Sequence, residues 1–399
     1  MTERESPLLS VATLPAIQAA LAAAGMDGWL LYDFRGTNPI ARAMLGLEGM
    51  QSRRIFAWIP TRGTPVAVTH AIEQAPWARW PAAWERRVYA SWRSLESEIA
   101  SIAGGKKVAM EYSPGDAVPV VDRIPAGVLE LVRAAGADVV TSADLVTRFF
   151  AVWSAEGLAS HKRAAEQLRT IAHSAFARAG AAAASGAPIT EFALMQWIKE
   201  RFTAGGLETD HGPNVSATEN AANPHYEPSE GTPRLLNKGD AILIDLWATE
   251  SGGIYADQTW MASIGEPSAK LRTVWTAVRD ARDAALTLLK SRIESGTAVR
   301  GADADDAART VIEQAGFGPY FTHRTGHSID ARALHGSGPN LDNLETREER
   351  LLISGVGFSV EPGVYIPGEI GVRSEVNCWI GERELLITPG TIQRDLIIV

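Results

Sequence analysis

The sequence has a single cysteine, Cys378, among its 399 residues, which excludes an intrachain disulfide and a zinc site built from several cysteines. Such sparse use of cysteine is typical of proteins in a reducing compartment. Long apolar runs are also missing, since no stretch approaches the ~18 uninterrupted apolar residues of a membrane span. The charged opening MTERESPLLS precedes no signal-like apolar core. We therefore expect a soluble, cytoplasmic protein with no membrane partner.

Positive charge is in the minority. Lys and Arg number 38 against 47 Asp and Glu, which gives a formal net charge of −9. A protein that binds nucleic acid by neutralising phosphates normally carries a basic stripe, so we expect no nucleic-acid partner. With 46% hydrophobic and 21% charged residues, the composition is that of a folded globular protein. At about 150 residues per domain, the length corresponds to two or three domains.

The N-terminal part alternates short apolar runs with helix-like segments, a pattern that predicts an α/β layer around one sheet. Helices are expected at 14–24 and 95–103. Strands are expected at 28–32, 54–59, 64–68, 107–110 and 138–140.

The C-terminal part has longer amphipathic helices, which we expect to begin near Ser154 and Ser268 and to cover 303–315, where Gly316 ends the third helix. Strand signals lie at 241–246, 253–261, 357–364, 371–380 and 384–388. We therefore predict an α+β protein in which a smaller α/β domain, 1–152, precedes a C-terminal domain, 153–399, with a mostly antiparallel sheet flanked by helices.

Two aspartates lie in neighbouring predicted strands of the C-terminal domain. Asp245 ends an apolar run, where an ionised carboxylate is rarely left unless it is paired or binds a metal. Asp257 lies in the next strand, and the turn-like segment 250–253 between them predicts a hairpin with both side chains close together. Taken singly, each aspartate could instead cap a turn.

Two glutamates occupy similar positions nearer the C-terminus. Glu361 follows the apolar run 358–360. Glu375 is spaced by two residues from Arg373, so a strand would direct both side chains to one face. Taken alone, this Arg–Glu pair could equally be an exposed ion pair.

Three histidines lie in short polar contexts, each of which is by itself compatible with a histidine of no special role. His327 follows Thr325-Gly326, and His335 lies eight residues later. His225 lies in a predicted loop. For His161, His173 and His323, the surrounding sequence gives no indication of a functional role.

Taken together, the four carboxylates and His327 form the ligand set of a dinuclear metal site. Two divalent cations would cancel the four negative charges and remove the penalty of clustering them. Oxygen-rich ligands with one imidazole suit Mn²⁺, Co²⁺, Fe²⁺ or Zn²⁺, and we expect Mn²⁺. Ions about 3.5–4 Å apart share one water and convert it to a hydroxide nucleophile.

The motifs around these residues resemble those of the pita-bread metallopeptidases, which include Xaa-Pro dipeptidase (prolidase), aminopeptidase P and methionine aminopeptidase. In the family's order, the matching segments are Ile244-Asp245, Tyr255-Ala256-Asp257-Gln258-Thr259, Thr325-Gly326-His327, Val360-Glu361-Pro362-Gly363-Val364-Tyr365 and Val372-Arg373-Ser374-Glu375. The resemblance covers roughly 155–390 and is greatest to the bacterial Xaa-Pro dipeptidases. It implies a pita-bread fold for the C-terminal domain.

The resemblance also implies a role for each site residue. Asp245 would bind one ion, His327 with Glu361 the other, and Asp257 with Glu375 would bridge them. The bridging hydroxide would attack the carbonyl before a C-terminal proline, with His225 stabilising the intermediate. Glu361 would carry the proton, and His335 and Arg373 would orient the substrate. A homodimer is implied as well.

The sequence departs from the family pattern in several places. The two aspartates are twelve positions apart, one more than is usual, so their hairpin should carry an extra residue. An expected arginine is replaced by Trp260, and an expected glycine by Asp330. No metal ligand is lost. Aminopeptidase P, acting on longer peptides, is the nearest alternative function, and a peptide-binding pita-bread protein without catalysis is an alternative of another class.

Overall fold

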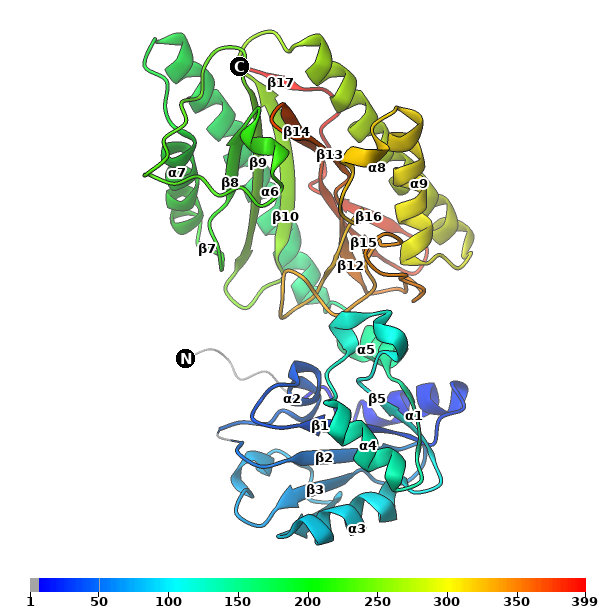
Figure 1. Ribbon diagram of the computed structural model, residues 1–399. Helices are drawn as coiled ribbons and strands as arrows, with labels where there is room; N and C mark the ends of the chain where they lie inside the picture. The colour runs from blue at the N-terminus through cyan, green and yellow to red at the C-terminus, as the bar shows by residue number, and fades with distance from the viewer. Residues whose placement is uncertain (1–6, 50) are drawn as a thin grey trace. The chain divides into compact units, whose positions relative to one another are not determined.

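The computed structural model describes residues 7–49 and 51–399. The chain forms two compact units, Met1–Phe150 and Ala151–Val399 (Figure 1). Among the helices of the described segments, none combines the length and the apolar character needed to cross a membrane.

The N-terminal unit is built on one mixed six-stranded sheet with the strand order β4-β3-β2-β1-β5-β6. Its strands are β1 (Gly28–Asp33), β2 (Ile55–Pro60), β3 (Val66–His70), β4 (Glu85–Tyr89), β5 (Lys107–Met110) and β6 (Asp138–Thr141). The edge strand β4 was not predicted, because its sequence ERRVY is mostly exposed and lacks an apolar alternation.

Helices cover both faces of this sheet, as an α/β layer requires. Trp29 and Leu31 of β1 pack with α1 (Leu14–Ala23), α2 (Pro39–Leu45) and α5 (Ala143–Phe149). Leu30 and Tyr32 point to the other face, toward α3 (Trp92–Ala103) and α4 (Ala126–Ala134). Three short 3₁₀ turns complete the unit, at Ala75–Trp77, Pro114–Asp116 and Pro119–Val121.

Three helices of the C-terminal unit begin within two residues of the predicted positions, and a fourth, at Glu191–Ala204, was not predicted. The unit contains α6 (Ala155–Ala184), α7 (Glu191–Ala204), α8 (Ala269–Ser295) and α9 (Gly301–Gln314). Ser154 and Ser268 cap α6 and α8 by accepting hydrogen bonds from backbone N–H groups of the first turn. Gly316, just beyond α9, has φ +84°, which a glycine adopts without strain.

The strands of the C-terminal unit pair almost entirely antiparallel, and the predicted α+β class is confirmed. One sheet has the order β17-β10-β9-β7 with β8 also paired to β9, a second the order β11-β12-β15-β16, and β13 pairs with β14. The strands are β7 (Leu207–Glu208), β8 (Asn214–Ala217), β9 (Ala241–Glu250), β10 (Ala256–Ser263), β11 (Ser328–Ile329), β12 (Gly357–Val360), β13 (Gly363–Ile366), β14 (Ile370–Arg373), β15 (Val376–Ile380), β16 (Leu385–Thr388) and β17 (Ile397–Ile398). The 3₁₀ turns are Asn220–Ala222 and Gly318–Tyr320.

Two segments that were each predicted as one long strand are divided in the structure, so these two predictions were wrong. The run 357–364 is divided into β12 and β13, and 371–380 into β14 and β15. Pro362, which has no N–H to donate to a ladder, lies in the first break. The breaks contain Glu361 and Glu375, so both glutamates lie where a strand changes direction.

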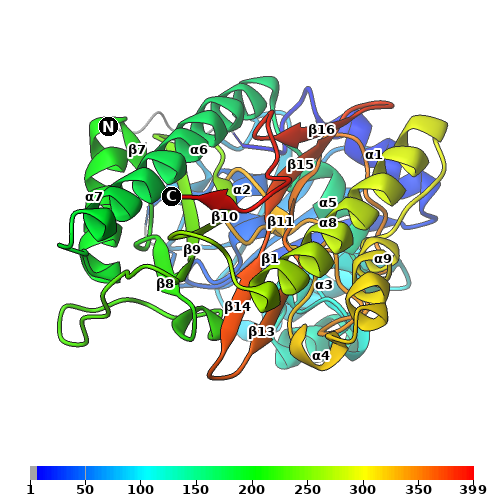
Figure 2. The same ribbon diagram turned by 90° about the horizontal axis from the view of Figure 1, so that it is seen from above.

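The C-terminal core has two parts, each formed by helices packed against strands. The helices α6 and α7 pack with β9 and β10 around Phe176, Ile198 and Ile244. The helices α8 and α9 pack with β12, β14 and β15 around Val278, Phe358 and Val372. Seen from above, α6 and α8 lie over the strands (Figure 2).

Candidate metal centre

A cavity of about 1040 Å³ in the C-terminal unit contains all the residues predicted for the site. The predicted residues that line it are His225, Asp245, Asp257, His327, His335, Glu361, Arg373 and Glu375. They come from segments up to 150 positions apart in sequence, since the first is residue 225 and the last is residue 375. Their individual roles remain predictions.

The hairpin of β9 and β10 presents both aspartates on one face. In the antiparallel register Asp245 lies opposite Thr259, and Asp257 opposite Trp247. Directly opposite residues project to the same side of a sheet, and so do residues two apart. The ladder is regular from Ala241–Ser263 to Ala248–Ala256, so the extra residue of this hairpin lies in the loop.

The position of His327 is set by hydrogen bonds at both of its ends. Its backbone N–H donates to Ser359 Oγ (2.9 Å), and this hydroxyl donates to Glu361 Oε1 (2.9 Å). Its ring Nδ1 donates to the Ser328 carbonyl (3.0 Å), which can only accept. The lone pair therefore lies on Nε2, and burial lowers the pKa of this histidine.

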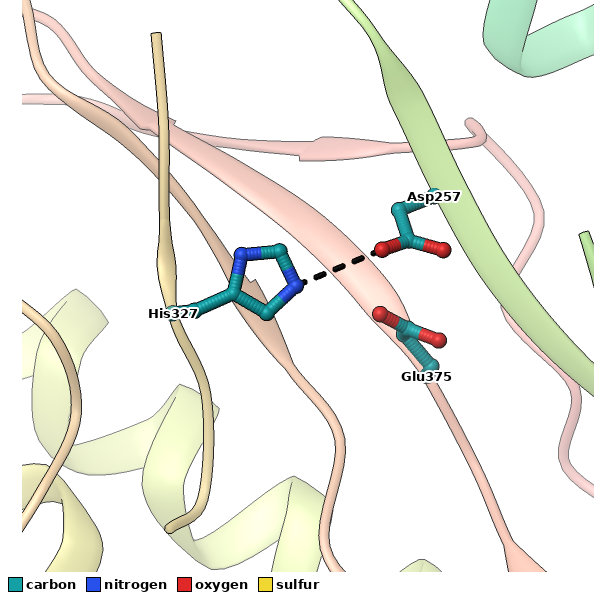
Figure 3. Close-up of side chains that lie close together, drawn as sticks. All are labelled: Asp257, His327 and Glu375. Carbon is teal, nitrogen blue, oxygen red and sulfur yellow. Dashed lines mark ion pairs between the residues drawn. The ribbon is translucent and has the colours of Figure 1, made fainter. Parts of the chain in front are cut away.

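His327 Nε2 faces carboxylate oxygens rather than donors. It lies 3.3 Å from Asp257 Oδ2 and 3.4 Å from Glu361 Oε1. His327, Asp257 and Glu375 point toward one another and offer ligand atoms that all lie within 4.8 Å of each other (Figure 3). A lone pair and carboxylate oxygens at this separation repel one another unless a cation or a proton lies between them.

Two oxygens of this trio lack a hydrogen-bond partner among the described residues, although both are buried: Asp257 Oδ1 and Glu375 Oε1. Burial, together with the negative charge of Glu361, raises the pKa of Asp257 well above its ordinary value. Burial and the charge of Asp257 do the same to Glu375. Buried carboxylates without partners are costly, and divalent cations would supply the missing partners. The donor set therefore fits the predicted pair of ions.

Asp245 is held by an arginine. It forms an ion pair with Arg373 Nη2, and Arg373 Nε donates to Thr259 Oγ1 (2.8 Å) and lies 4.0 Å from Glu361 Oε2. Burial acts to lower the pKa of Arg373, but the surrounding carboxylates, Asp245 first, raise it well above its ordinary value. Arg373 thus neutralises part of the carboxylate cluster.

The two other predicted histidines lie in loops at the cavity wall. His225 is exposed and follows the turn Asn220–Ala222. The His335 ring centroid lies 4.2 Å from that of His327, and the electrostatic coupling of the two imidazoles, together with burial, lowers the pKa of His335 to about 4. Asp330, at the position of the missing glycine, holds the His335 loop by accepting three backbone N–H groups, from Arg332, Ala333 and Ser337.

Three further residues of the site were not singled out from the sequence. Thr259 donates to Glu375 Oε2 (2.8 Å). His323 lines the cavity, donates through Nδ1 to the Arg324 carbonyl (2.7 Å), and therefore accepts through Nε2 from the Tyr365 hydroxyl (2.8 Å). Tyr365 lies 3.5 Å from Arg373 Nη1. Thr259 and Tyr365 belong to motifs quoted above, but nothing in the sequence distinguishes His323 from its neighbours.

Comparison with known proteins finds similarity to peptidases. The model of metallopeptidase family M24 matches residues 161–382. A Lactobacillus delbrueckii subsp. lactis protein named Xaa-Pro dipeptidase is 33% identical over 189 residues, which is 47% of each chain. A Mycobacterium bovis protein named "Probable dipeptidase PepE" is 26% identical over 364 residues, 90% of this chain and 88% of that protein.

Solved structures extend the similarity to the whole chain. Dipeptidase PepE from Mycobacterium ulcerans has a TM-score of 0.72 at 25% identity and covers 97% of both chains. The C-terminal pita-bread domain and the smaller N-terminal domain predicted from the sequence are thereby confirmed. The match to the Lactobacillus protein, in contrast, spans about half of that protein's length.

Proposed function

Because the chain belongs to metallopeptidase family M24, we propose that it is an Xaa-Pro dipeptidase that uses two divalent metal ions, Mn²⁺ being the expected metal. The observation that carries the proposal is the trio Asp257, His327 and Glu375, with its two buried carboxylate oxygens that have no hydrogen-bond partner within 7–49 and 51–399. Asp245 and Glu361 line the same cavity and complete the ligand set.

In this proposal the ions, when bound, activate water and polarise the scissile carbonyl. Glu361 accepts a proton from the attacking water and delivers it to the leaving nitrogen. Glu361 is suited to this role because Ser359 fixes one of its oxygens. His225 stabilises the developing charge, while His335 and Arg373 orient the carboxylate of the substrate, for which a guanidinium fork is well matched.

Aminopeptidase P activity remains the nearest alternative. The size of the cavity supports this alternative, because a larger cavity can hold a longer peptide. A volume of about 1040 Å³ is at the upper end of small-molecule pockets and exceeds what a dipeptide needs. A binding protein without catalysis is disfavoured, because all five ligand positions carry coordinating side chains.

The deciding experiment compares Ala-Pro with Ala-Pro-Ala as substrates of the chelator-treated full chain, with and without added Mn²⁺. Mn²⁺-dependent release of proline from the dipeptide alone is the expected result. Preferential cleavage of the tripeptide would replace the proposal by aminopeptidase P. Cleavage of neither peptide by protein that holds two ions would show that the substrate class is wrong.

Two variants and one physical measurement complete the test. Asp257→Ala and Glu375→Ala are expected to abolish hydrolysis while leaving the far-ultraviolet circular dichroism unchanged; full activity of either would overturn the two-ion assignment. Light scattering of the purified chain measures its molar mass in solution. We expect the mass of a homodimer, and the mass of a monomer would contradict that prediction.

A further inference from the structure

A fully buried cation lies outside the cavity, on the helix α8. Arg282 is 0% exposed. Its Nη1 donates to Ser374 Oγ (2.6 Å) and to the Gln393 carbonyl (2.7 Å), while Nε and Nη2 donate to Asp283 Oδ1. Removing a guanidinium from water costs several kcal/mol unless its partners compensate. The partners of Arg282 therefore indicate which parts of the fold this buried cation holds together.

The first partner lies between two residues of the metal centre. Ser374 connects Arg373 to Glu375, in the break between β14 and β15. Its backbone N–H donates to the Pro362 carbonyl (3.4 Å), in the segment that follows Glu361. The Glu375 N–H donates to the Thr259 carbonyl of β10 (3.3 Å). Ser374 thus lies where the two glutamate-bearing breaks meet.

The second partner leads to the aspartate-bearing hairpin. The side chain of Gln393 accepts from the Met261 N–H (2.9 Å) and donates to the Met261 carbonyl (2.6 Å). Met261 belongs to β10, the strand of Asp257 and Thr259. A single nitrogen, Arg282 Nη1, therefore donates hydrogen bonds both to Ser374, beside Glu375, and to Gln393, whose side chain is hydrogen-bonded to β10.

We propose that Arg282 is a positioning residue of the metal centre, holding the Glu375 segment and β10 at the separation that two shared ions require. This inference rests on the proposed function. Metal ligands need placement to within about 0.5 Å, and the partners that orient ligands typically contribute 10–100-fold in metal affinity. Glu375 and Asp257, the two predicted bridging ligands, are the ones whose spacing Arg282 controls.

Four variants separate positioning from simple core stability. Arg282→Lys retains one nitrogen able to bond both Ser374 and Gln393, whereas Arg282→Met retains none. Ser374→Ala removes only the hydroxyl that Arg282 contacts. Ser263→Ala is the matched control, since the Ser263 hydroxyl is buried on β10 and has no partner in the described part of the chain.

The readouts are Mn²⁺ affinity and stoichiometry by calorimetry, the visible spectrum of the Co²⁺-loaded protein, and metal-free stability in urea. Ser374→Ala and Arg282→Met should lower affinity for at least one ion about tenfold or more and change the Co²⁺ spectrum. Arg282→Lys should recover most of that affinity, and Ser263→Ala should match the wild type.

Wild-type affinity and spectrum in Ser374→Ala would overturn the inference, even if Arg282→Met fails to fold. The inference would also be overturned if Ser374→Ala and Arg282→Met lowered the stability of the metal-free protein without changing its metal affinity or its Co²⁺ spectrum. Failure of the proposed function has a different signature: the wild type itself would bind no pair of ions, and the positioning role would fall with it.

Discussion

The hydroxyl of Thr259 donates to Glu375 Oε2 at 2.8 Å while accepting from Arg373 Nε at the same distance. One small side chain on β10 therefore orients a predicted bridging carboxylate and separates it from the arginine that pairs with Asp245. The guanidinium can only donate, so the proton of this hydroxyl points to a carboxylate. Glu375 Oε2 is the nearer acceptor, since Asp245 Oδ1 lies 3.4 Å away.

Replacing Thr259 by valine keeps the shape of the side chain and removes every hydrogen bond of the hydroxyl, to Glu375, to Asp245 and from Arg373. Glu375 would then lose the donor that orients it, so we expect Mn²⁺ affinity to fall about tenfold or more. Calorimetric titration of the metal-free protein measures this. Thr249→Val, on the neighbouring strand β9, should leave the affinity unchanged, and an equal loss there would rule out a specific role of Thr259.

Glu375→Gln should separate stability from metal binding. In the metal-free protein burial and the neighbouring carboxylates Asp257 and Glu361 disfavour ionisation of Glu375 and raise its pKa, and the substitution removes this penalty, so we expect the free energy of unfolding to rise by about 2 kcal/mol. Metal binding should be lost. Urea denaturation in the presence of a chelator tests the gain, and Glu294→Gln, an exposed change on α8, is the control. A less stable variant would contradict the electrostatic account.

His161 should make the C-terminal unit sensitive to acid. It is buried between the Tyr255 carbonyl and the Thr388 hydroxyl, and burial lowers its pKa from 6.5 to about 4. The unfolded state binds a proton first as the pH falls, so stability is lost between about pH 6.5 and pH 4, by about 3 kcal/mol. Hydrogen exchange of α6 amides measures this, and His161→Gln should remove the contribution of His161, while His327 and His335, whose pKa values are also lowered, retain theirs.

Glu111 should produce the opposite trend in the N-terminal unit. It is fully buried, and burial raises its pKa from 4.5 to about 7, despite hydrogen bonds from Trp29, Asn38 and Ser142. Here the folded state retains its proton longer, so stability falls by about 3 kcal/mol as the pH rises from about 4.5 to 7. Hydrogen exchange of β1 and β5 amides follows this change.

Glu111→Gln should flatten that dependence. The variant should also be less stable at every pH, because the new amide N–H₂ group faces the N–H₂ group of Asn38. Each of the two pH variants is the control for the other, since they lie in different units. Loss of the alkaline trend in His161→Gln would show that the assignment to Glu111 is wrong.

The local patterns of the sequence predicted most elements, and the misses have identifiable causes. Apolar periodicity located α6 and α8, and serine caps marked their first residues. The edge strand β4 was missed because its side chains are mostly exposed. The breaks at Glu361 and Glu375 were read as continuous strand, since apolar residues flank both glutamates. Periodicity reports which face is buried, not where a chain bends.

The sequence by itself determined the kinds of ligand, their order along the chain and the face of β9 and β10 that carries the aspartates, because strand alternation is a local property. Only the tertiary structure decided that Arg373 pairs with Asp245, that Thr259 donates to Glu375, and that Arg282 reaches Ser374 from α8. These contacts join residues roughly 90 to 130 positions apart. They depend on how helices and sheets pack, which no short-range pattern encodes.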